Sequence, residues 1–180
     1  MWSRRAPSAR DEHGGAAIGF GLVLPMLLAL TVGVLELALV ITDYHRAGTA
    51  ASRVARLAAI ADAVTDVRGL ADGATVSCVF SAGATSCTSG TADSSAFAAL
   101  LAEARTVMPD LAAGNLRVDY TNIGLGDPAT PGGIKPLVTA RLVNLRHDFR
   151  FLRVIKPLTD GIDYPDFASR QVAKGQGAAP

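Results

Sequence analysis

Charge is nearly absent from one long stretch of this sequence. Between Gly15 and Ile41 the only charged side chain is that of Glu36. A transmembrane helix needs about 20 predominantly apolar residues, and lipid leaves backbone amides no partner outside the helix. The shortage of charge therefore predicts a transmembrane helix over residues 14–41. Pro25 lies inside it and removes one amide donor, which transmembrane helices tolerate.

Two other interpretations of this run are less favoured. A buried core helix is disfavoured because globular helices seldom exceed roughly 20 residues. A cleaved secretory signal would explain the basic residues Arg4, Arg5 and Arg10. However, the apolar part of a signal peptide is only about 7–15 residues long. We therefore expect an uncleaved anchor, or one trimmed only at its front edge.

Other features are scarce as well, and they narrow the function. The formal net charge is only +1, which gives no reason to expect nucleic acid as a partner. Aromatic residues make up 6% of the chain, which disfavours an aromatic-lined ligand site. None of the three histidines has metal-ligand spacing, and no nucleophile elbow, phosphate loop or dinucleotide fingerprint occurs. We therefore expect no enzyme and no cofactor.

Cysteine is limited to Cys78 and Cys87. The surrounding residues predict a hairpin, with strands at 75–80 and 85–88 and a turn centred on 82–83 that sets the two cysteines opposite each other. Cross-strand Cβ atoms lie about 4.5–5.5 Å apart or closer, so a disulfide is geometrically possible. Two free thiols are the alternative, and a metal site is disfavoured because two thiolates alone rarely form one. A disulfide would indicate an oxidising compartment.

The disulfide also decides the predicted orientation. The basic residues that flank the apolar run are equal in number before and after it, so the positive-inside rule gives no answer; they are Arg4, Arg5, Arg10, Arg46, Arg53 and Arg56. With the cysteines outside, the chain divides into a cytoplasmic leader (1–13), a transmembrane helix (14–41), an amphipathic helix continuing it (42–66), an extracytoplasmic α+β domain (67–173) and a disordered tail (174–180).

The remaining elements predict an α+β fold. A small apolar stripe continues the first helix to about Asp66 at helical spacing; it consists of Tyr44, Ala47, Ala51, Val54, Ala58 and Ala61. A second helix is capped by Ser94 or Ser95 and ends before Pro109. Further strands are predicted at Leu116–Thr121, Ile134–Leu145, Phe149–Ile155 and Phe167–Val172. We expect the long helix to pack on a small antiparallel sheet, with the one further helix.

Gly14–Val40 reads GGAAIGFGLVLPMLLALTVGVLELALV, with a Gly-Ala-rich step, a Leu-Pro in an apolar run and a later glutamate. This pattern resembles that of the TadE-like family. The continuation to Ala61 is similar, as are PLVTARLVNL (136–145) and YPDFAS (164–169). The resemblance implies a pilin-like fold and a pseudopilin-like structural protein for assembly or initiation of a tight-adherence (Flp-type) pilus. An envelope binding module on a signal anchor, unconnected with pili, is the alternative.

The resemblance also implies partners and a processing site. The expected partners are the inner membrane, other pilins or assembly proteins bound through the N-terminal helix, and a prepilin peptidase. Cleavage would fall between Gly14 and Gly15, which makes Gly19 the fifth residue of the mature chain. Family members carry a glutamate there, which offsets the amine of a neighbouring subunit in lipid. Gly19 cannot do so.

Three other anchor residues match the family pattern, namely Phe20, Pro25 and Glu36. Glu36 has two interpretations. It could form an ion pair between subunits, because ionisable groups in a span usually face a partner. The favoured interpretation is that it lies at the outer headgroup level and is simply hydrated.

Overall fold

The computed structural model describes residues 10–126, 133–151 and 161–174. The chain forms two compact units, one made of residues 1–40 and 148–161 and the other of residues 41–147 and 162–180. Helix α1 (Arg10–Ile60) supplies residues to both.

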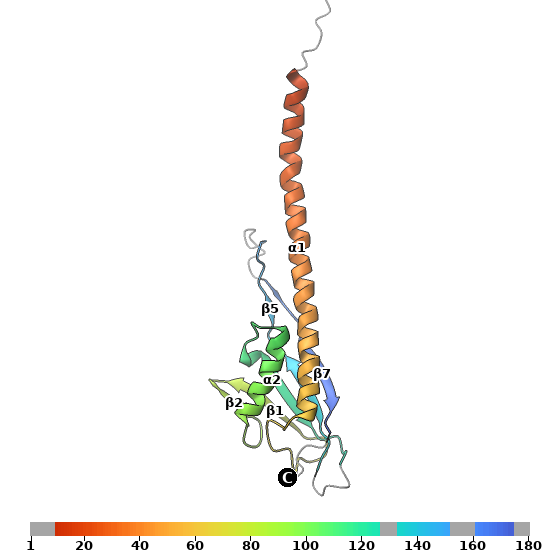
Figure 1. Cartoon of the computed structure of the whole chain (residues 1–180), viewed down its shortest axis with the longest axis vertical. Helices are drawn as coiled ribbons and strands as arrows, with labels where there is room; N and C mark the ends of the chain where they lie inside the picture. Colours follow the sequence, from red (N-terminus) through yellow and green to blue (C-terminus); the bar gives the residue numbers. More distant parts are fainter. Residues whose placement is uncertain (1–9, 127–132, 152–160, 175–180) are drawn as a thin grey trace, which may run out of the picture. The chain divides into compact units, whose positions relative to one another are not determined.

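The first unit contains the apolar part of α1 (Figure 1, red to orange). Its large side chains are exposed along almost the whole run; they include Ile18, Phe20, Leu22, Leu24, Met26, Leu28, Leu30, Val34, Leu35 and Leu37. The helix is long and apolar enough to cross a membrane, and little of its apolar stretch is buried. A core helix of a soluble domain would bury these side chains. The exposed side chains therefore fit a membrane-capable helix and do not fit the core helix of a soluble domain.

Helix α1 begins and ends earlier than predicted. It begins at Arg10, within the expected leader, and residues 1–9 lie outside the described part. It ends at Ile60 instead of near Asp66. At Val64 the backbone has tertiary partners: its amide donates to the Tyr120 hydroxyl at 3.2 Å and its carbonyl accepts from the Asp93 amide at 2.6 Å. These bonds satisfy backbone groups that would otherwise favour another helical turn.

The second unit is built on a five-stranded antiparallel sheet with the order β2-β1-β3-β4-β7. Its strands are β1 (Thr75–Ser81), β2 (Ala84–Cys87), β3 (Leu116–Thr121), β4 (Leu137–Leu142) and β7 (Phe167–Val172). A separate pair consists of β5 (Arg146–His147) and β6 (Ile162–Asp163). Helix α2 (Ser94–Val107) precedes the short 3-10 helix η1 (Ala113–Asn115).

Two helical segments pack on the sheet, as the α+β prediction requires. The C-terminal part of α1 buries a stripe of small residues, namely Ala47, Ala50, Ala51, Val54, Ala55 and Ala58, and α2 buries Phe97, Leu100, Leu101 and Ala104. The two helices lie side by side, since Arg53 of α1 and Glu103 of α2 approach to 3.7 Å. Of the residues predicted in this stripe, Ala47, Ala51, Val54 and Ala58 are buried. Tyr44, predicted in this stripe, is exposed.

The hairpin carrying the cysteines is confirmed. Cys78 pairs directly with Cys87 across β1 and β2, and the two form a disulfide. The turn falls on Ala82 and Gly83, which have φ values of 51° and 84°. Two-residue hairpins favour such positive φ angles because they match the twist of the strands. The disulfide joins edge strand β2 to β1.

Three local predictions need correction. Asp93 caps α2, instead of Ser94 or Ser95, and accepts from the amides of Ser95 at 2.8 Å and Ala96 at 3.1 Å. The strand predicted at Ile134–Leu145 is limited to β4. Phe149–Phe151 is not a strand, and the rest of that predicted strand lies outside the described residues. The short strands β5 and β6 pair around this segment instead.

Replacing both cysteines by alanine should lower the free energy of unfolding by about 2–3 kcal/mol, because the bridge restricts a small loop of the unfolded chain. Urea unfolding of the detergent-solubilised chain, followed by circular dichroism, measures this. A reductant should destabilise the wild type and leave the double variant unchanged. Equal stability of the oxidised and reduced wild type would contradict the prediction.

Acid should weaken the α2 cap. The Ser95 hydroxyl, followed by the Ala96 and Ser95 amides, holds the pKa of Asp93 below its usual value of 3.8. Because the pKa of Asp93 is lower in the folded chain than in the unfolded chain, its carboxylate stabilises the fold at pH values above the unfolded pKa. This contribution is lost as the pH falls through the folded pKa.

Thermal unfolding between pH 2 and 7 tests this prediction, with Asp93→Asn as the matched control because asparagine also caps helices but does not titrate. The wild type should lose more of its melting temperature on acidification than Asp93→Asn. Parallel curves for the two proteins would count against a capping carboxylate.

Candidate functional site

The residues of the expected processing site lie in the N-terminal part of α1. Gly14 and Gly15 are both within the helix. Gly19 and Phe20 are exposed, and a Cβ atom added at Gly19 would meet nothing within 4 Å. Pro25 is inside the helix. This part of α1 therefore presents an open surface of small and apolar side chains.

Glu36 behaves differently from its neighbours. Its side chain is only 1% exposed, although Leu35 and Leu37 beside it are each 58% exposed. Its two carboxylate oxygens accept from consecutive backbone amides: Oε1 from Arg150 at 2.6 Å and Oε2 from Phe151 at 3.0 Å. All three residues belong to the first unit.

This arrangement corrects the favoured interpretation of Glu36. The carboxylate is not exposed to solvent, because residues of the same chain cover it. The ion pair between subunits stays a prediction. A buried carboxylate with no partner would cost several kcal/mol. Hydrogen bonds from backbone amides to an ionised carboxylate are stronger than bonds between neutral groups, and they stabilise the charged form.

The segment that binds Glu36 emerges from the β5–β6 pair. Arg146 of β5 and Asp163 of β6 approach to 3.4 Å, and the chain from Asp148 to Gly161 belongs to the first unit. It is therefore an excursion of the chain between two paired strands. Glu36 accepts from the backbone amides of Arg150 and Phe151 in this segment, so these two bonds do not depend on which side chains the two residues carry.

A second polar contact ties α1 to β5 within the second unit. His147 is 5% exposed, and its Nδ1 lies 2.8 Å from Oδ2 of Asp43. Nearby, the ring of Tyr44 packs edge-on against Phe167, with centroids 4.8 Å apart. This cluster fixes the first turns of α1 in the second unit against the sheet. The cluster therefore serves to hold these elements together.

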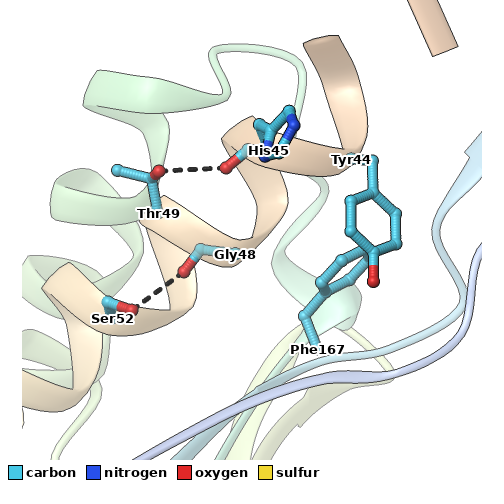
Figure 2. Close-up of a pocket in the computed structure, with 6 residues that line it drawn as sticks. All are labelled: Tyr44, His45, Gly48, Thr49, Ser52 and Phe167. Carbon is cyan, nitrogen blue, oxygen red and sulfur yellow. Dashed lines mark hydrogen bonds between the residues drawn. The ribbon is translucent and has the colours of Figure 1, made fainter. Parts of the chain in front are cut away.

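A shallow groove lies on the same face of α1 (Figure 2). Its lining residues are Tyr44, His45, Gly48, Thr49, Ser52 and Phe167. The Thr49 hydroxyl donates to the His45 carbonyl at 2.9 Å and the Ser52 hydroxyl to the Gly48 carbonyl at 3.0 Å. No acid and no cysteine lines the groove, and over the described residues no three His, Cys, Asp or Glu side chains gather as a metal site.

A known protein family matches the segment that contains the apolar run. Residues 14–56 match the model described as TadE-like protein. This segment is a TadE-like family domain. Searches of curated proteins and of solved structures gave no match. The TadE-like segment covers the apolar run, Glu36 and most of the small-residue stripe, so the two parts of α1 belong to one family pattern.

The sequence did not predict the partners of Glu36 or the Asp43–His147 contact. A backbone amide has no sequence signature, so nothing marks Arg150 and Phe151 as donors. The one available signal was Glu36 itself, because an acid in an apolar run requires a partner. Glu36 therefore indicates that a hydrogen-bond donor is needed, but it does not indicate which residue supplies the donor.

Glu36→Ala should raise the exchange rates of the Arg150 and Phe151 amides roughly 10- to 100-fold, since a hydrogen bond to a charged group contributes about 1.5–3 kcal/mol. Hydrogen–deuterium exchange of the chain in micelles measures these rates. Leu35→Ala, which removes an exposed neighbour, is the matched control and should leave them unchanged. Unaltered exchange in Glu36→Ala would show that the two amides do not depend on the carboxylate.

Proposed function

We propose that this chain is a membrane-anchored, pseudopilin-like structural protein that serves assembly or initiation of a tight-adherence (Flp-type) pilus. The observation that carries the proposal is the exposed apolar surface of α1 within the TadE-like segment. Such a surface requires lipid or other helices around it. TadE-like pilin-family proteins are structural.

The membrane-capable helix and the disulfide indicate an envelope protein anchored by its N-terminus. We further propose that residues 14–41 span the inner membrane, with residues 1–13 in the cytoplasm and the α+β domain outside. The disulfide supports this orientation because such bonds persist in oxidising compartments. A prepilin peptidase cutting between Gly14 and Gly15 would remove the leader.

Partner pilins would contact the N-terminal part of α1. Gly15 and Gly19 are four residues apart and so share a helix face, whereas Gly21, two residues after Gly19, lies on another side of the helix. In lipid, helices associate by close packing, and small residues permit the backbones to approach. An added Cβ at Gly15, Gly19 or Gly21 meets nothing within this chain. A larger side chain there would therefore disturb only a neighbour.

Replacing Gly19 and Gly21 with leucine should abolish crosslinking of the anchor to other pilus proteins, because the added side chains hold neighbouring helices apart. The measurement is photocrosslinking in membranes from a site within residues 14–41. Leu22→Ile and Leu28→Ile, which change exposed residues without changing bulk, form the control.

Intact-mass analysis of the same preparations supplies a second readout. Loss of residues 1–14 is expected for pilin-type processing. Undiminished crosslinking in the leucine variant would refute packing through the glycines. Loss of the whole apolar run would identify a secretory signal and overturn the anchor itself.

A further inference from the structure

The Glu36 contact leaves two side chains exposed beside the anchor. Arg150 and Phe151 bind Glu36 through their backbone amides, while the Arg150 side chain is exposed and Phe151 is 53% exposed. Exposed Leu35 and Leu37 flank Glu36 on α1. A cation and an aromatic ring are therefore held next to an apolar helix surface, within one unit.

The depth of this contact can be judged from the helix. Glu36 precedes Ile41, the last residue of the apolar run. At about 1.5 Å of rise per residue, the two lie about 7–8 Å apart along the axis. Interfacial elements insert their apolar side chains about 5–10 Å into the headgroup and acyl boundary. The contact therefore matches the level at which the anchor leaves the hydrocarbon.

The chemistry of the Arg150 and Phe151 side chains also suits the membrane–water interface. Aromatic rings and long basic side chains are favoured at the membrane–water interface, where the ring contacts acyl chains and the cation reaches the phosphates. An arginine pairs with phosphate through several N–H donors. Phe151, Leu35 and Leu37 are all exposed apolar side chains of the first unit.

We propose that Arg150 and Phe151 form a second membrane contact, with the phospholipid headgroup layer of the membrane that α1 spans. Phe151 lies at the acyl boundary and Arg150 binds lipid phosphate. Glu36 is a positioning residue, since its carboxylate fixes their backbone at this depth. The proposal rests on the membrane anchorage in the proposed function and is independent of any role in a pilus.

Tryptophan fluorescence of the full chain in phosphatidylglycerol-containing vesicles tests the contact. Trp2→Phe removes the single native tryptophan, and Phe151→Trp introduces the probe at an exposed site. Brominated lipids should quench its emission, which should lie at short wavelength. Adding Glu36→Gln should reduce the quenching and shift the emission to longer wavelength, because the amide side chain cannot accept both backbone bonds.

Two further variants separate the possible outcomes. Leu28→Trp, in the middle of the run, reports anchorage alone and should be quenched with or without Glu36→Gln. Arg150→Gln in the Phe151→Trp background keeps the backbone donor to Glu36 but removes the cation. Its emission should therefore be quenched less by brominated lipid in the phosphatidylglycerol-containing vesicles. If Leu28→Trp is quenched by lipid and Phe151→Trp only by aqueous iodide, the proposal is overturned while anchorage stands. If neither is quenched by lipid, both are overturned.

Discussion

One carboxylate sets the main constraint on this protein. Glu36 is the only charged residue between Gly15 and Ile41, and an ionised group in such surroundings must be paired or protonated. Two consecutive backbone amides, from Arg150 and Phe151, satisfy it within the chain. Because the donors are backbone groups, they do not titrate or depend on side-chain identity. The apolar helix can therefore keep an acid without relying on a neighbouring subunit.

This has a consequence for the proposed pilus role. The TadE-like pattern leads one to expect an acid at Gly19 that neutralises a neighbour's amine, and this chain has only the small, exposed glycine there. The acid that it does carry is held by the chain itself. The features left for association in lipid are small and apolar, which favours van der Waals packing between helices over ionic pairing.

In the second unit, the part of α1 that is buried carries a stripe of small residues. Each alanine side chain buries little apolar area, so the stripe alone contributes little to the core. Larger residues of α2 and β3, such as Phe97, Leu116 and Tyr120, complete the core. The Cys78–Cys87 bridge joins edge strand β2 to β1. The α+β unit thus combines a close-packed centre with a covalently fixed edge.

The sequence alone determined the features that depend on local pattern: the apolar run, the amphipathic continuation, strands Leu116–Thr121 and Phe167–Val172, and the register that joins Cys78 to Cys87. Hydrophobic period and turn chemistry act over a few residues, so they can be read in order along the chain. Only the tertiary structure decided where α1 ends, that Asp93 caps α2, and which groups bind Glu36. The end of α1 and the Glu36 contact depend on backbone groups brought from distant positions, and a backbone amide is the same in every residue except proline. The Asp93 cap is local, and the sequence left it undecided because aspartate and serine are both good helix caps.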